Sequence, residues 1–101
     1  MSEIVNSIRQ RISRVAAAIQ LAEEASELAK AAAKLARIEE GTNPTPVTYQ
    51  QAWDNLLEEL NDVMNAAMVL GLTTSRISQF EKLLRWRDRL KEQEERNHAH
   101  H

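Results

Sequence analysis

Residues that break helices are rare in this 101-residue chain, and most of them fall in one place. The chain has two glycines and two prolines, and Gly41, Pro44 and Pro46 lie within one short segment. Glycine suits the C-cap of a helix and proline prevents a helix from continuing, so this segment predicts a turn between two long helices. The rest of the chain is rich in Ala, Leu, Glu, Gln, Lys and Arg, which favour helix. The sequence therefore predicts an all-α fold.

Capping signals divide the chain further. Residues Ser2 to Glu40 predict helix, with one break near Arg11 to Arg14. Thr48 and Gln51 have the spacing of a capping box, in which each side chain bonds the other residue's backbone N–H. They predict the start of a helix that runs to about Leu70.

A shorter turn at Gly71 separates this helix from a last amphipathic helix. Its apolar positions are Ile77, Phe80, Leu83, Leu84 and Leu90. Amphipathic helices joined by short turns pack antiparallel, so we expect a bundle of three to four helices in a single domain, residues 1–96. Residues 97–101 are polar and include His98, His100 and His101, which predicts a disordered tail or a purification remnant and no catalytic metal site.

Composition excludes several classes of function. There are no cysteines, which rules out disulfides, thiolate metal sites and cysteine nucleophiles. The formal net charge of −2 is too balanced for a protein that grips a nucleic-acid polymer by its backbone. No apolar run approaches the roughly 20 residues that span a membrane, and no secretory signal is visible. We expect a soluble cytoplasmic protein without a membrane or nucleic-acid partner.

Some acidic residues do not fit the pattern of a solvated helix face. On a helical wheel Glu24 lies beside the apolar stripe of its helix, next to Ala17 and Ala31, and Glu27 follows on the flank of that stripe. Glu23 falls on the wet side of the same helix. Only Glu23 therefore has the position of an ordinary surface acid.

The helix after the turn repeats this arrangement. Glu59 sits at the edge of the apolar face, between Ala52 and Ala66, and Asp62 lies one step further round. Asn65 falls on the polar side. Each helix thus offers two carboxylates, three residues apart, beside small side chains that leave room for a ligand.

Two carboxylate pairs on facing helices need a countercharge in a partly buried groove. A hard divalent cation such as Mg²⁺ prefers oxygen ligands and commonly shares its coordination with substrate phosphates. The alternative is a set of semi-exposed acids paired along the helix, for example Glu27 with Lys30 and Lys34. The residue pattern by itself leaves both readings open.

Two motifs carry a resemblance to a known family. The first is Glu23-Glu24-Ala25-Ser26-Glu27, and the second is Glu59-Leu60-Asn61-Asp62. In this order, one per helix with a loop between, they resemble the Glu-Glu-x-x-Glu and Glu-x-x-Asp motifs of the all-α nucleoside triphosphate pyrophosphatases, and in particular the MazG-like enzymes. The resemblance covers about residues 19–72.

The resemblance implies a cofactor and a reaction. By position, Glu24, Glu27, Glu59 and Asp62 would hold Mg²⁺, for which Mn²⁺ can substitute. Glu23 would hold a water or a lysine beyond the metal, or act with Glu24 on the attacking water. The reaction would be hydrolysis of a nucleoside triphosphate, canonical or modified, to a nucleoside monophosphate and pyrophosphate, as in the housecleaning of nucleotide pools.

The resemblance also implies contacts to the substrate. Asn65 resembles a nucleotide-contacting asparagine of several relatives, although its place on the wheel would require a neighbouring subunit or a twisted helix. Lys30 and Lys34 are candidates to hold the departing pyrophosphate, because cations bind phosphate oxygens by charge-assisted hydrogen bonds. Arg76 and Arg85 are further candidates.

Two other functions remain open at this stage. One is a non-enzymatic helical module that works by association, and the other is a pyrophosphatase of the same fold that acts on phosphoribosyl-ATP. The resemblance to small MazG-like enzymes implies a homo-oligomer, a dimer or a dimer of dimers. The apolar surface also favours assembly, since one short bundle has more of it than it can cover. The residues concerned are Leu21, Leu28, Ile38, Trp53 and Trp86.

Overall fold

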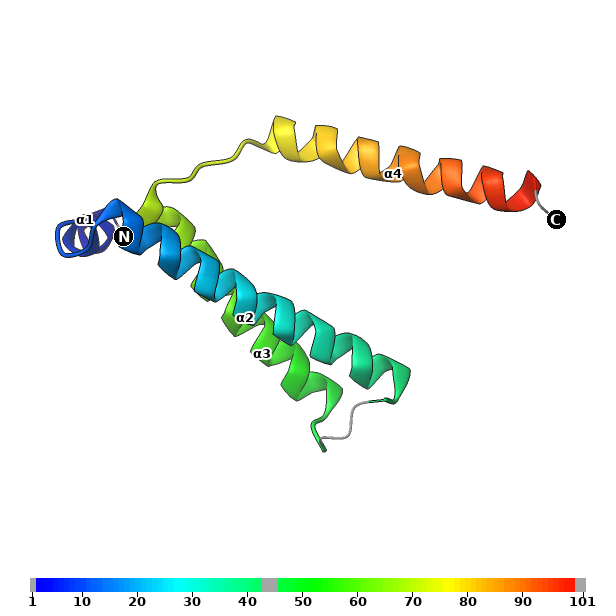
Figure 1. Cartoon of the computed structure of the whole chain (residues 1–101), viewed down its shortest axis with the longest axis horizontal. Coiled ribbons are helices and arrows are strands. Elements are labelled where there is room, and N and C mark those ends of the chain that lie inside the picture. The colour runs from blue at the N-terminus through cyan, green and yellow to red at the C-terminus, as the bar shows by residue number, and fades with distance from the viewer. Residues whose placement is uncertain (1, 43–45, 100–101) are drawn as a thin grey trace.

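A computed structural model of the chain describes residues 2–42 and 46–99. It contains four helices, α1 (Ser2–Arg9), α2 (Arg14–Glu40), α3 (Tyr49–Leu70) and α4 (Arg76–Ala99) (Figure 1). No strand occurs in these two ranges, so the prediction of an all-α chain is confirmed for the described residues.

The helix ends lie where the capping residues place them. Ser13 precedes α2, and its hydroxyl accepts a hydrogen bond from the Ala16 N–H, so the expected break between the first two helices is present. Thr48 and Gln51 form the expected capping box at the start of α3. Gly41 and Gly71 end α2 and α3 with φ of 75° and 94°, a left-handed conformation that glycine adopts without steric cost.

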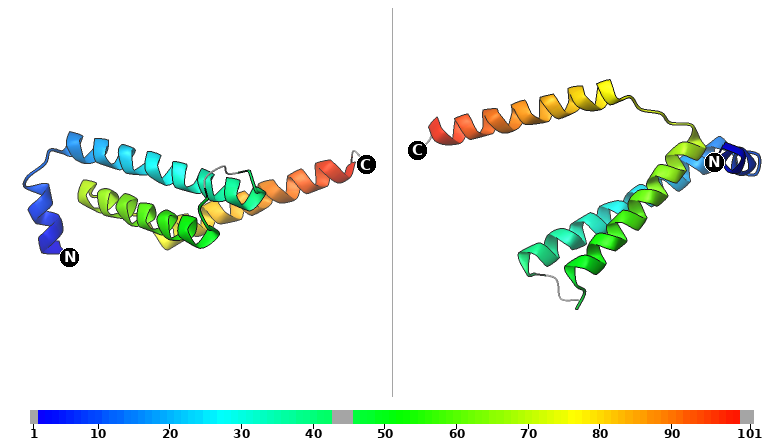
Figure 2. Two further views of the ribbon diagram at one scale, coloured as in Figure 1. Left: turned by 90° about the horizontal axis from the view of Figure 1, so that it is seen from below. Right: turned by 180° about the vertical axis from the view of Figure 1, so that it is seen from behind.

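The packed part of the molecule is the antiparallel pair of α2 and α3, which lie side by side (Figures 1 and 2). Within the described ranges four residues are buried, and all four are alanines. They are Ala17 and Ala31 on α2, and Ala52 and Ala66 on α3. Small side chains at these positions let the two helix backbones approach closely.

Several large apolar residues of α3 lie outside the seam with α2. Trp53, Leu60 and Met64 share an apolar face of α3 on the helical wheel, and all three are exposed. The seam against α2 instead follows the positions of Ala52, Glu59 and Ala66. The half-buried Leu56 and Val63 adjoin this seam, so α2 covers one edge of the apolar face of α3 and leaves Trp53, Leu60 and Met64 outside the contact.

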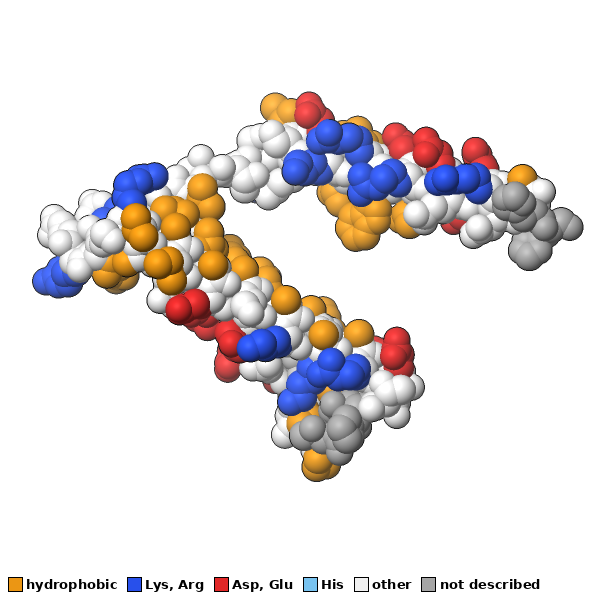
Figure 3. Space-filling view, in the orientation of Figure 1, with side chains coloured by type: hydrophobic (Ala, Val, Ile, Leu, Met, Phe, Trp, Pro, Cys, Tyr) orange, Lys and Arg blue, Asp and Glu red, His pale blue; other side chains and the backbone are white. Residues whose placement is uncertain are grey.

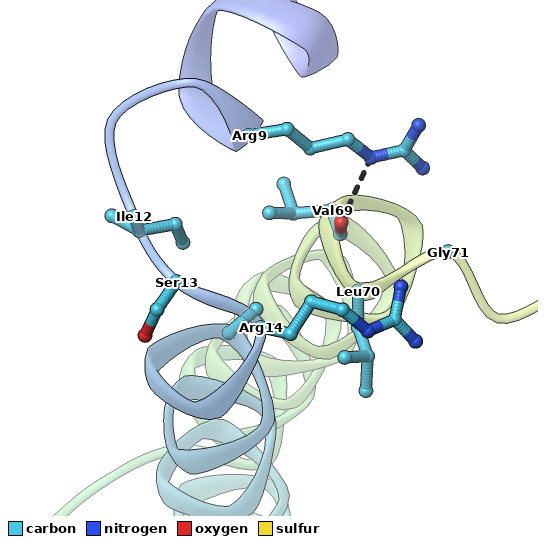
Figure 4. A pocket seen from close by; sticks show the side chains of 8 residues that line it. Arg9, Ile12, Ser13, Arg14, Val69, Leu70 and Gly71 are labelled. Carbon is cyan, nitrogen blue, oxygen red and sulfur yellow. Dashed lines mark hydrogen bonds between the residues drawn. The ribbon is translucent and has the colours of Figure 1, made fainter.

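Helix α1 is fastened to the far end of α3 by one arginine (Figure 4). The Arg9 Nε donates to the Val69 carbonyl at 2.9 Å, and its Nη2 donates to the Met68 carbonyl at 2.7 Å. The last carbonyls of a helix lack intrahelical partners and carry partial negative charge, so a guanidinium is a favourable cap there. This contact sets the position of α1 across the end of the α2–α3 pair.

Helix α4 extends away from the α2–α3 pair instead of packing along it (Figures 1 and 2). None of its described residues is buried, and Phe80 and Trp86 are 60% and 56% exposed. The helix also continues through residues 97–99, into the stretch that was expected to be a tail; His100 and His101 lie outside the described residues.

Among the described residues, none of the helices combines the length and the apolar character needed to cross a membrane.

Candidate metal centre

Three of the four predicted metal ligands come together across the seam between α2 and α3. Glu24 on α2 and Glu59 and Asp62 on α3 each place a carboxylate oxygen within 4.8 Å of the other two. Glu24 and Glu59 are half-buried, while Asp62 is exposed. Acidic side chains gather along the middle of the helix pair in the space-filling view (Figure 3).

The buried alanines explain why these carboxylates meet. Residues seven positions apart lie on nearly the same face of a helix, because two turns take about 7.2 residues. Glu24 is centred in this way between Ala17 and Ala31, and Glu59 between Ala52 and Ala66. Each glutamate therefore lies in the row of its helix that faces the partner, where the alanines hold the helices close together.

The surroundings of Glu59 disfavour its negative charge. Its pKa is raised above the usual carboxyl value, first because partial burial removes water from the charged form. Repulsion by neighbouring carboxylates adds to this effect, in the order Asp62, Glu27, Glu24 and Glu58. A bound cation would remove this repulsion, so the electrostatics favour a positive ligand at the seam.

Glu27 and Lys30 lie beside the centre and contact each other. The Lys30 Nζ is 3.3 Å from the Glu27 Oε1, and both side chains are more than half exposed. Glu27 does not belong to the three-carboxylate cluster, although it is close enough to raise the pKa of Glu59. The sequence left open either acids paired with lysines along the helix or an acidic groove for a metal. The structure contains both, the Glu27–Lys30 pair and the three-carboxylate cluster, next to each other.

The remaining predicted residues on α2 are Glu23 and Lys34. Glu23 is exposed and is not one of the three clustered acids, in agreement with its wheel position. Lys34 is half-buried, one turn past Lys30.

Gln20 is a residue of the site that the sequence analysis missed. Its Nε2 donates a hydrogen bond of 2.7 Å to the Glu24 Oε1. The available signal was its position four residues before Glu24, since side chains at that spacing are neighbours on a helix. This hydrogen bond fixes the direction of the Glu24 carboxylate.

A pocket of about 250 Å³ adjoins the acidic cluster, and Glu24 and Asp62 form part of its wall. Asn65 also lines this pocket. The wheel directed Asn65 away from the groove, but the structure places it beside both acids within one chain. The side chain of Asn65 is exposed, in agreement with its place on the polar side of the wheel, and its contact with a nucleotide stays a prediction.

The donor set is suited to a hard cation. Carboxylate oxygens are the ligands that Mg²⁺, Mn²⁺ and Ca²⁺ prefer, and Glu24, Glu59 and Asp62 offer three such groups with converging oxygens. The described residues of this centre thus could hold a divalent metal ion, and they favour none of these cations over the others.

Comparisons of the chain with protein-family models, with curated proteins and with solved structures find no significant match.

Proposed function

We propose that the chain is a Mg²⁺-dependent nucleoside triphosphate pyrophosphohydrolase of the MazG-like kind. The observation that carries the proposal is the convergence of Glu24, Glu59 and Asp62 across the α2–α3 seam. These residues belong to the two motifs that resemble the family. One comes from α2 and two come from α3, so a single metal ion could contact both helices. Housecleaning of nucleotide pools would place the enzyme in the cytoplasm.

Each residue has a stated role in this proposal. Glu24, Glu59 and Asp62 would hold the cation, and the neighbouring Glu27 would be a fourth ligand. When bound, the ion would neutralise phosphate oxygens and lower the pKa of a water molecule enough for attack at neutral pH. Gln20 keeps the Glu24 carboxylate in position, and Glu23 orients the attacking water from the exposed side.

Lys30 and Lys34 would stabilise the leaving pyrophosphate. Both follow the acids on α2, and their ammonium groups can hydrogen bond phosphate oxygens. Lys30 would exchange its contact with Glu27 for the phosphate when Glu27 turns to the metal.

The second candidate is a non-enzymatic module that works through helical association. It is favoured by the exposed apolar side chains of α4 and by the uncovered face of α3. Under this alternative the acidic cluster would be dispensable, and Mg²⁺ would not affect stability.

The decisive experiment is incubation of the purified protein with Mg²⁺ and a panel of ribo- and deoxynucleoside triphosphates, followed by chromatography of the products. We expect a nucleoside monophosphate and pyrophosphate. Glu24→Gln and Asp62→Asn should each lower turnover by roughly a hundredfold or more, since even residues that only support metal ligands commonly contribute 10- to 100-fold.

Asp54→Asn is the matched control, because Asp54 is an exposed acid of α3 that accepts a hydrogen bond from Gln50. It should leave turnover unchanged. Release of orthophosphate, or no turnover together with no Mg²⁺-dependent rise in melting temperature, would favour the second candidate or another reaction.

A further inference from the structure

A second pocket, of about 360 Å³, lies where the turn between α1 and α2 meets the end of α3 (Figure 4). It adjoins the pocket beside the acidic cluster, because three residues line both, but the two pockets differ in charge. The wall of the first includes the acids Glu24 and Asp62. The lining of the second has no acidic side chain and two arginines, Arg9 and Arg14. This second pocket, the arginine pocket, therefore suits a negatively charged ligand.

The two arginines reach the arginine pocket from different elements. Arg9 is the last residue of α1, and Arg14 is the first residue of α2. Both side chains extend toward the side of the pocket where Gly71 ends α3 (Figure 4). A Cβ on Gly71 would lie 3.6 Å from the Arg9 Nη2, so the glycine leaves the space beside this guanidinium open. A ligand at this side of the pocket could contact both arginines.

The guanidinium groups keep hydrogen-bond donors for such a ligand. A guanidinium carries N–H donors on all three of its nitrogens. Arg9 uses its Nε and Nη2 to hold the carbonyls of Val69 and Met68, so its Nη1 remains available. Within residues 2–42 and 46–99, no hydrogen bond or ion pair of the Arg14 side chain occurs. The arginine pocket thus has a cation on each side that can still donate.

The position of Arg14 is unfavourable for a cation unless an anion is near. The first turn of a helix carries partial positive charge, so acidic side chains stabilise it and basic ones do not. The first turn of α2 contains Arg14 and no acid. Arg9 differs, because the carbonyls at the end of α3 offset part of its charge. An anion in the arginine pocket would supply the countercharge that Arg14 lacks.

A phosphate group fits these donors better than a carboxylate does. A carboxylate has two oxygens in one plane, which match the fork of a single guanidinium. The oxygens of a phosphate group point in several directions, so they can accept hydrogen bonds from two guanidinium groups on different elements. Arginine is also the side chain best suited to bidentate contact with phosphate.

We infer that the arginine pocket is a phosphate-binding site in which Arg9 and Arg14 are the donors. The bound group bridges α1 and α2 beside Gly71, and it thereby adds a second contact that holds α1 in place. The site is separate from the candidate metal centre, since none of the three clustered acids lines it. The inference does not depend on the proposed function.

The test is an NMR titration of the full chain with inorganic phosphate, in chelator and at an ionic strength held constant with chloride. Chelator excludes binding through a metal ion. We expect saturable shifts of the Gly71 amide and of the Arg14 Nε–H. Arg14→Gln should raise the Kd for phosphate at least about fivefold, the size of one lost charge-assisted hydrogen bond. Arg14→Lys, which keeps the charge but lacks the fork, should give an intermediate Kd.

Arg11→Gln is the matched control, because it removes the same charge from the same turn. The Arg11 Nη1 donates to Ser7, and Arg11 does not line the arginine pocket. Its Kd for phosphate should stay within about twofold of the wild-type value, since chloride screens the general charge effect. Circular dichroism verifies that the variants keep their helices, and if Arg14→Gln does not, Arg14→Lys is compared with Arg11→Gln instead.

Two further anions identify the ligand. Acetate should bind more weakly than phosphate, and equal binding of acetate would overturn the assignment to phosphate. Glycerol phosphate tests the source of the group. If it binds more tightly than inorganic phosphate, the site takes the phosphate of a larger molecule, and if it does not, the site takes the free ion; either result supports the inference when it depends on Arg14.

Two results would overturn the inference entirely. One is the absence of saturable shifts in the wild type, and the other is an equal loss of affinity in Arg14→Gln and Arg11→Gln. Because the titration contains no metal, neither result bears on whether nucleoside triphosphates are hydrolysed. Phosphate binding without any hydrolysis would likewise support the site and leave the proposed reaction rejected.

Discussion

Glu59 experiences the repulsion of the whole acidic cluster. It lies half-buried at the seam, and burial and the carboxylates around it raise its pKa. When folding raises the pKa of a carboxyl, the folded state binds more protons than the unfolded state in the range between the two pKa values. The free energy of unfolding therefore falls as the pH rises through this range. The charge of Glu59 thus destabilises the folded state at neutral pH. This destabilisation is absent at low pH, where the carboxyl is protonated in both the folded and the unfolded state.

Replacement of Glu59 by glutamine removes this destabilisation along with one metal ligand. We expect Glu59→Gln to raise the melting temperature of the metal-free protein at neutral pH, with the gain disappearing below the ordinary carboxyl range. Mg²⁺ should stabilise the wild type by mass action and the variant much less. Thermal unfolding in chelator and in Mg²⁺, followed by circular dichroism across pH, measures both effects.

Glu39→Gln provides the control for this prediction, since Glu39 is an exposed acid of α2 outside the cluster. It should change neither the metal-free melting temperature nor the response to Mg²⁺. A Glu59→Gln variant that melts below the wild type in chelator and still responds fully to Mg²⁺ would contradict the assigned role.

At the scale of the helices, local chemistry predicts the ends and the acidic rows, and tertiary contacts decide the rest. Ser13, Thr48 and the two glycines mark the helix ends because capping depends on a few adjacent residues. The position of Glu24 follows from its spacing to the alanines alone.

The covered face of α3 could not be predicted in the same way. Periodicity identifies an apolar face, but it does not tell which part of that face a neighbouring helix will cover. Trp53 and Met64 stay exposed, while α2 packs on the edge that carries Ala52 and Ala66. The pocket at Asn65 was missed for a related reason, since it depends on the long-range contact of Arg9 with the end of α3.

The alanine seam gives a prediction for the helix pair. Ala31 is 4% exposed at the seam, and Ala31→Leu should force α2 and α3 apart. Overpacking of this kind costs about 1–3 kcal/mol in the free energy of unfolding. It should also weaken the response of the melting temperature to Mg²⁺, because Glu24 and Glu59 would be separated.

Ala29→Leu tests whether the effect belongs to the seam. Ala29 lies on the same helix but is exposed, so its replacement should be nearly neutral and should leave Mg²⁺-dependent stabilisation intact. Urea unfolding with and without Mg²⁺ compares the two variants. Equal effects of both substitutions would mean that alanine at the seam does not control the helix spacing.

At the scale of the whole molecule, the chain is too extended to be a compact body by itself. Its radius of gyration is 18.4 Å, whereas a compact chain of about 100 residues has roughly 13 Å. The difference comes mainly from α4, which extends away from the α2–α3 pair. Its side chains Phe80, Leu83 and Trp86 are exposed. Apolar side chains in such a position indicate a surface that association would cover.

The last prediction is that wild-type chains associate through α4 as a dimer or a dimer of dimers. Leu83→Ser should weaken association at least about tenfold, because burial of a leucine side chain contributes roughly 1.5–3 kcal/mol. Lys82→Ser is the control, since Lys82 lies with Arg85 and Arg89 on the cationic side of the helix. Light scattering after size-exclusion chromatography, over a range of concentrations, gives the masses.

The three clustered acids belong to one chain, so a dissociated Leu83→Ser variant should still bind Mg²⁺. A monomeric wild type would show that α4 has no partner copy, whereas loss of Mg²⁺ binding on dissociation would mean that assembly holds the α2–α3 seam together.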